Sequence, residues 1–94
     1  MTLTVVNEPE ASRYALLEDG ERIGVAEYEL HDDEIVFTHT EVDESRREKG
    51  MASLLVTEAL DDVRANSDRR VVVTCPYIRR WLPQHPEYRD LLDR

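Results

Sequence analysis

The sequence predicts an α/β fold in which antiparallel hairpin strands are followed by a strand–helix–strand unit and by C-terminal helices. Three observations support this prediction. A turn with a glycine, Glu18–Glu21, separates two strand-like runs. Apolar residues recur at helical spacing over positions 51–65. Three consecutive valines, Val71–Val73, follow the helix, and short apolar runs of this kind are typical of buried parallel strands.

The antiparallel half begins with strands expected at Ser12–Glu18 and Arg22–Leu30. In the turn between them, Gly20 stands where a hairpin needs a positive φ. A second turn is expected at His31–Glu34, although it contains no glycine. These signals predict consecutive strands that pair as a meander.

A third strand is expected at Ile35–Val42. Side chains alternate between the two faces of a strand, so this run is expected to divide into two sets. One face would carry Phe37, His39 and Glu41, and the other Val36, Thr38, Thr40 and Val42.

The parallel half is expected to contain a helix from Met51 to Ala65, with Asn66 as a left-handed stop. A strand at Arg70–Cys75 would follow, buried on both faces and ended by Pro76. The tail is then expected to form two short helices, at Ile78–Leu82 and Pro86–Leu92, whose apolar side chains seat them on the sheet.

Composition limits the possible classes of protein. A chain of 94 residues predicts a single domain over 1–94. With 40% hydrophobic and 35% charged residues, and no apolar run near the ~20 residues that cross a bilayer, we expect a soluble protein away from membranes. The single cysteine, Cys75, cannot form an internal disulfide, which predicts a cytoplasmic location.

The chain is acidic, with a net charge of −9 and a pI near 4.7. This charge argues against general nucleic-acid binding, which needs a basic face. A negative field could concentrate a cationic substrate such as an amine, or the acidic surface could serve only solubility. We expect no metal.

A basic segment opposes this overall charge. Arg46, Arg47 and Lys49 precede Gly50, between the third predicted strand and the predicted helix. A glycine lets the backbone approach a ligand closely, and the first amides of a helix attract anions, so this order is typical of a phosphate or pyrophosphate cradle. The alternative is a solvated loop and an ordinary turn.

The cradle would lie at the carboxyl end of a parallel strand, where ligands of α/β sheets gather. If the two parallel strands diverge there, backbone groups of Thr40 and Val42 would face an open slot. An extended ligand with amides could pair with that edge like an added strand. A pyrophosphate joined to an amide-bearing arm describes coenzyme A.

Three segments, Phe37–Val42, Arg47-x-x-Gly50-x-Ala52, and Cys75–Tyr77 with His85–Tyr88, resemble in this order the GNAT superfamily of N-acetyltransferases, in its short single-domain YjdJ-like branch. The resemblance implies a mixed sheet with splayed parallel strands and acetyl-CoA as cosubstrate. It also implies that Arg47 and the amides from Lys49 to Ala52 hold the pyrophosphate. The cofactor-binding candidates are Thr40, Glu41, Val42, Arg46, Arg47, Lys49, Gly50, Met51, Ala52 and Cys75.

The implied activity is transfer of an acetyl group from acetyl-CoA to an amine of a small molecule or a protein. The candidates for proton removal are His39 and Glu41, which could instead be structural or solvated. Tyr77 could protonate the thiolate or simply pack, and Cys75 could line the site or carry the acetyl group. We favour direct attack by the amine.

The chain is shorter than a typical member and lacks the usual amino-terminal helices, so the acceptor site would be open or completed by a partner subunit. A monomer and a homodimer are both compatible with this expectation. The alternative functions are a coenzyme A or acetyl-CoA binding module without turnover, and a small interaction protein without a ligand.

Overall fold

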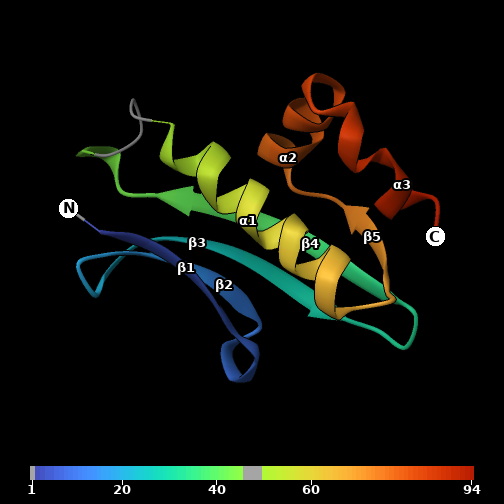
Figure 1. Cartoon of the computed structure of the whole chain (residues 1–94), viewed down its shortest axis with the longest axis horizontal. Coiled ribbons are helices and arrows are strands. Elements are labelled where there is room, and N and C mark those ends of the chain that lie inside the picture. The colour runs from blue at the N-terminus through green and yellow to red at the C-terminus, as the bar shows by residue number, and fades with distance from the viewer. Residues whose placement is uncertain (1, 46–49) are drawn as a thin grey trace.

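The computed structural model describes residues 2–45 and 50–94 as a five-stranded sheet with helices packed against it (Figure 1). The sheet order follows the chain; the first four strands pair antiparallel and the last pair is parallel. The predicted fold class is therefore confirmed. The strands are β1 (Leu3–Glu8), β2 (Arg13–Glu18), β3 (Glu21–Leu30), β4 (Glu34–Val42) and β5 (Arg70–Val73). The helices are α1 (Met51–Asn66), α2 (Pro76–Trp81) and α3 (Arg89–Leu92), with 3-10 turns η1 (Pro9–Ala11), η3 (Leu82–Gln84) and η4 (Pro86–Tyr88).

The hairpin between β2 and β3 is as predicted. Asp19 and Gly20 both have positive φ, 51° and 89°, which is the conformation of a two-residue hairpin turn. The edge strand β1 was not predicted. Its sequence places Val5 beside Val6, which interrupts the alternation of an edge strand, and it forms because β2 offers a partner along its whole length.

The predicted alternation along β4 is wrong beyond Phe37. Glu27 pairs with His39 and Tyr28 with Phe37, so Thr38 is an extra residue, and β4 bulges there. A bulge shifts the alternation by one residue. Phe37 is therefore buried while His39 lies exposed on the opposite face.

All three α-helices contribute buried side chains to one hydrophobic cluster on a single face of the sheet. In Figure 1, α1 lies over the sheet and runs roughly along β3 and β4, and α2 and α3 lie on the side of α1 where β5 is. Helix α1 ends one residue later than expected. Asn66 is helical and its side-chain amide donates to Asp62, so the left-handed stop is wrong; the extended Ser67 follows it.

The carboxyl end of the chain departs from the prediction in its element bounds and in the burial of β5. β5 ends at Val73, and the following helix begins at Pro76 itself, in the first-turn position that proline favours. β5 is also the edge of the sheet, so the expected burial on both faces is wrong: Val71 is buried, whereas Val72 is only half-buried. The second tail helix splits into η4 and α3.

Two adjacent carboxylates of α1 hold the layers together. The hydroxyl of Tyr14 in β2 donates to Asp62 over 2.6 Å, and that of Tyr88 donates to Asp61 over 2.7 Å. Burial first, and then the hydrogen bond to Asp62, raise the pKa of Tyr14 well above its usual value. Burial and the bond to Asp61 raise the pKa of Tyr88 to about 12. Each neutral phenol thus stays a donor.

Removing the hydroxyl of Tyr14, which donates to a carboxylate, should cost more stability than removing that of the neighbouring Tyr28. Tyr14→Phe should lower the free energy of unfolding by about 1.5–3 kcal/mol because its acceptor is ionised, and Tyr28→Phe by about 0.5–1.5 kcal/mol because its acceptor is the neutral amide of Asn7. Urea denaturation at neutral pH measures both. Equal losses, or a larger loss for Tyr28→Phe, would contradict this account.

Candidate functional site

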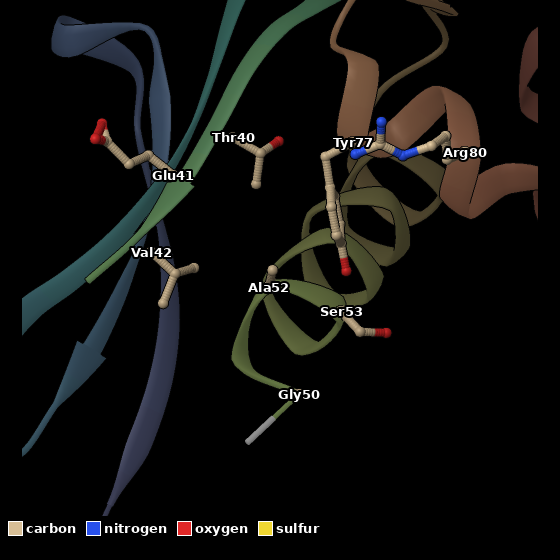
Figure 2. A pocket seen from close by; sticks show the side chains of 8 residues that line it. All are labelled: Thr40, Glu41, Val42, Gly50, Ala52, Ser53, Tyr77 and Arg80. Atoms are coloured by element: carbon tan, nitrogen blue, oxygen red, sulfur yellow. The ribbon is translucent and has the colours of Figure 1, made fainter. Parts of the chain in front are cut away.

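A cavity opens where β5 leaves β4. The two strands pair only as far as Phe37 and Val73, and the amides of Thr74 and Cys75 then both donate to the carbonyl of Phe37, over 3.0 and 3.1 Å. Beyond that point a cavity of about 370 Å³ lies between β4, the start of α1 and α2 (Figure 2). The residues that line it are Thr40, Glu41, Val42, Gly50, Ala52, Ser53, Tyr77 and Arg80.

The β4 wall of the cavity presents backbone. The amide of Asp43 donates to Ile23 in β3 over 2.8 Å, and backbone groups alternate in direction along a strand. The N–H and C=O of Thr40 therefore point away from β3, toward the cavity. Figure 2 shows the side chains of Thr40 and Val42 on the side of α1, and that of Glu41 on the other side of the strand.

The floor of the cavity is the first turn of α1. Gly50 is its N-cap residue, with φ 70° and ψ 20°, and the amide of Leu54 is bonded to the carbonyl of Gly50. The three preceding amides, 51–53, have no acceptor within the helix, and its first turn carries no acidic residue. A Cβ added to Gly50 would meet no atom within 4 Å, so the space above this residue is open. The arrangement suits an anion.

The α2 wall supplies a cation and a phenol. Tyr77 and Arg80 are three residues apart, and both lie within α2, so their side chains share one face of this helix. Figure 2 shows the Tyr77 ring between β4 and α2, with the Arg80 guanidinium beside it. Burial first, and then the nearby Cys75 thiol, raise the pKa of Tyr77. Tyr77 was predicted here but Arg80 was missed; its spacing from Tyr77 was the available signal.

Ser53, which the sequence prediction also missed, joins two walls of the cavity. Its hydroxyl accepts a hydrogen bond from the indole N–H of Trp81 over 2.9 Å. The Trp81 ring stacks on His85 with centroids 3.7 Å apart, and the His85 Nδ1 lies 2.9 Å from the carbonyl of Trp81. These contacts fix α2 against the first turn of α1, and therefore fix the position of Arg80.

Cys75 lies next to the cavity rather than in its lining. Its side chain is buried, with 1% exposed, and its Sγ is 3.2 Å from the hydroxyl of Thr40. Thr40 thus separates the thiol from the cavity. Cys75 is also the N-cap residue of α2, with an extended backbone, φ −65° and ψ 122°.

His39 and Glu41 lie together on the face of the sheet that is opposite to the helices. Their side chains are 54% and 62% exposed, and His39 Nε2 is 3.5 Å from Glu41 Oε1. The prediction that these two share a face holds, but the bulge at Thr38 turns that face away from the buried Phe37. Glu41 therefore contributes backbone to the cavity and its carboxylate to the opposite face.

Three of the predicted cofactor-binding residues, Arg46, Arg47 and Lys49, lie outside the described residues. Of the others, Thr40, Glu41, Val42, Gly50 and Ala52 line the cavity together. Met51 has a buried side chain, so only its backbone can face a ligand. In the described ranges, no three His, Cys, Asp or Glu side chains gather as a metal site, and no helix has the length and apolarity to cross a membrane.

Comparison with known proteins gives one family and one fold. The sequence profile described as "GCN5-related N-acetyl-transferase" matches residues 13–91. The chain is similar to a solution NMR structure from Staphylococcus aureus described as a GCN5-like candidate N-acetyltransferase, with a TM-score of 0.71 and 18% sequence identity. The similarity covers 95% of this chain and 86% of that one, and at this identity it shows the fold alone. The comparison with curated proteins finds no match.

Gly50 should be constrained by its backbone as well as by any ligand. Because its φ is positive, Gly50→Ala should lower the free energy of unfolding by about 1 kcal/mol, whereas Gly50→Asn should cost less, since asparagine tolerates this conformation. Thermal and chemical denaturation without ligand measure both. Because the space around an added Cβ is open, backbone strain is the expected source of any cost. A Gly50→Ala variant as stable as the wild-type protein would therefore show that this strain is absent.

Proposed function

Because the chain belongs to the GCN5-related N-acetyltransferase family, we propose that it is an N-acetyltransferase that moves an acetyl group from acetyl-CoA to an amine. The observation that carries the proposal is the cavity itself. One helix N-terminus, one diverging strand edge and one arginine converge there. No other arrangement in the described residues combines these three features.

Coenzyme A fits these walls chemically. Its pyrophosphate would bind the amides of the first turn of α1 and the guanidinium of Arg80, because both provide positive charge. The predicted cations Arg46, Arg47 and Lys49 precede this turn in sequence and would add to it. The amides of the pantetheine arm would pair with the backbone of Thr40 along β4, as an added strand does, and the arm would lie beside Val42.

The transfer needs little from the protein. The nitrogen of a neutral amine attacks the thioester carbonyl carbon, the C–S bond breaks, and the thiolate of coenzyme A receives a proton. We propose His39 and Glu41 as the groups that accept the proton of the amine, because they are accessible and adjacent. Tyr77 is the candidate donor to the thiolate: it lines the cavity, and its raised pKa keeps it protonated.

Direct attack by the amine remains the favoured route over a covalent intermediate on Cys75. The thiol is buried behind Thr40, and an inaccessible thiol is a poor nucleophile. A binding module without turnover would use the same cavity, but family membership favours transfer.

Coenzyme A should bind the cavity through Arg80. Arg80→Glu should weaken coenzyme A affinity about tenfold or more, because it replaces a charge-assisted contact with repulsion, and the effect should shrink at high salt. Arg79→Glu is the matched control, since the neighbouring exposed arginine does not line this cavity. Calorimetric titration and the ligand-dependent rise in Tm measure both variants. An equal loss in the two would indicate a general charge effect and contradict the assignment.

Turnover should not depend on the thiol. Wild-type protein should acetylate at least one member of an amine panel with release of coenzyme A, and Cys75→Ala should keep a substantial fraction of that rate. If the protein binds coenzyme A but acetylates no amine of the panel, the binding module would be favoured. Intact-protein mass spectrometry that finds an acetyl group on Cys75, discharged on addition of amine, would overturn direct attack.

A further inference from the structure

One face of the sheet has no helical layer in the described part of the chain. The buried side chains of α1, α2 and α3 all join the cluster on the other face. The residues that alternate outward from the five strands remain at least partly exposed, apart from Ala15. We call this surface the open sheet face; its side chains include Glu8, Arg13, Val25, Glu27, Glu29, Val36, His39, Glu41 and Val72.

The open sheet face is acidic around an apolar centre. Glu27, Glu29 and Glu41 project from neighbouring positions of β3 and β4, beside the half-buried Val25 and Val36. Of the arginines on this face, Arg13, in the row next to Glu27, is bonded to Glu8 over 2.7 Å, and Arg70 is paired with Glu34. Arg22 lies at one end of the face, in the hollow that Glu41 and Asp43 also line. The charge of the sequence is divided in the same way: residues 1–45 hold 13 of the 21 acidic residues but only two of the 12 basic ones.

The open sheet face and the proposed cofactor cavity share one strand, β4. Glu41 contributes to the lining of that cavity, and its carboxylate lies on the open sheet face beside His39. An amine substrate on the open sheet face would therefore lie beside His39 and Glu41, the two proposed proton acceptors. Both belong to β4, and the thioester of the proposed cofactor would lie beside the same strand.

The shape of the face favours a polymer over a small molecule. Its hollow at Arg22, Val25, Glu41 and Asp43 measures about 270 Å³, below the roughly 300–1,000 Å³ of typical small-molecule pockets. The carboxylates are instead spread along two strands, and apolar side chains lie between them. An extended chain that alternates cationic and apolar residues matches both features.

We propose that the open sheet face docks a lysine-bearing segment of a protein, which presents its amine for acetylation. The proposal rests on the proposed function for its chemistry, but the docking can be measured by itself. Lysine is cationic in solution, so Glu27, Glu29 and Glu41 attract it, and the valines of the face contact the apolar residues of the segment.

The test is a binding titration with a defined probe. A fluorescent peptide that alternates lysine and valine is titrated by anisotropy against the protein, with and without coenzyme A. Glu27→Lys combined with Glu29→Lys should weaken peptide binding about tenfold or more, with a strong salt dependence. The matched control is Glu58→Lys with Asp68→Lys, which makes the same change in net charge away from this face. The control should retain affinity within about threefold.

The outcomes separate this proposal from the proposed function. Failure of coenzyme A to bind would count against the acetyltransferase assignment, whereas the peptide titration without coenzyme A decides the docking. Equal losses in the two double variants, or no binding by the wild-type protein, would overturn the docking proposal. A polyamine that competes as well as the peptide would also overturn it, because the face would then bind a small amine. So would a dimer that sedimentation detects and that Val25→Arg dissociates, because the face would then bind a second copy of the chain.

Discussion

The divergence of β5 from β4 is the constraint on which the rest of the site depends. The carbonyl of Phe37 accepts two successive amides, from Thr74 and Cys75, and after this point the parallel ladder ends. Pro76 then starts a helix rather than continuing the strand. This brings Tyr77 and Arg80 opposite the end of β4 and leaves the cavity between them. A sheet that continued to pair would leave no room for a ligand there.

The bulge at Thr38 determines which side chains of β4 lie on each face of the sheet. It shifts the side-chain alternation, so that Thr40 and Val42 turn toward the helices while His39 and Glu41 turn to the open sheet face. A cofactor bound in the cavity and an acceptor on the other face would therefore approach the same strand from different sides. Without the bulge, the hydrophobic positions Phe37 and Val42 could not both be buried on one face.

The polar contacts of α1 explain how a small core holds these surfaces. Asp61 and Asp62 would be called solvent-facing from the helical pattern, yet both accept buried phenols, one from the sheet and one from the C-terminal helices. Ser53 does the same for the indole of Trp81. Hydrogen bonds that are shielded from water contribute more than exposed ones, so these contacts orient α1 between the sheet and α2.

The sequence by itself determined the fold class, the β2–β3 hairpin, the long helix and the parallel pairing of its flanking strands, because these depend on local periodicity and turn chemistry. It also identified Thr40, Val42, Gly50, Ala52 and Tyr77, which the structure brings together around one cavity. Only the tertiary structure decided the rest. The edge strand β1 needs β2 as its partner, and the bulge at Thr38 is visible only when β4 is aligned with β3. The spacing of Arg80 from Tyr77 places the two residues on one face of a helix, but only the packing of α2 opposite β4 shows that this face lines the cavity.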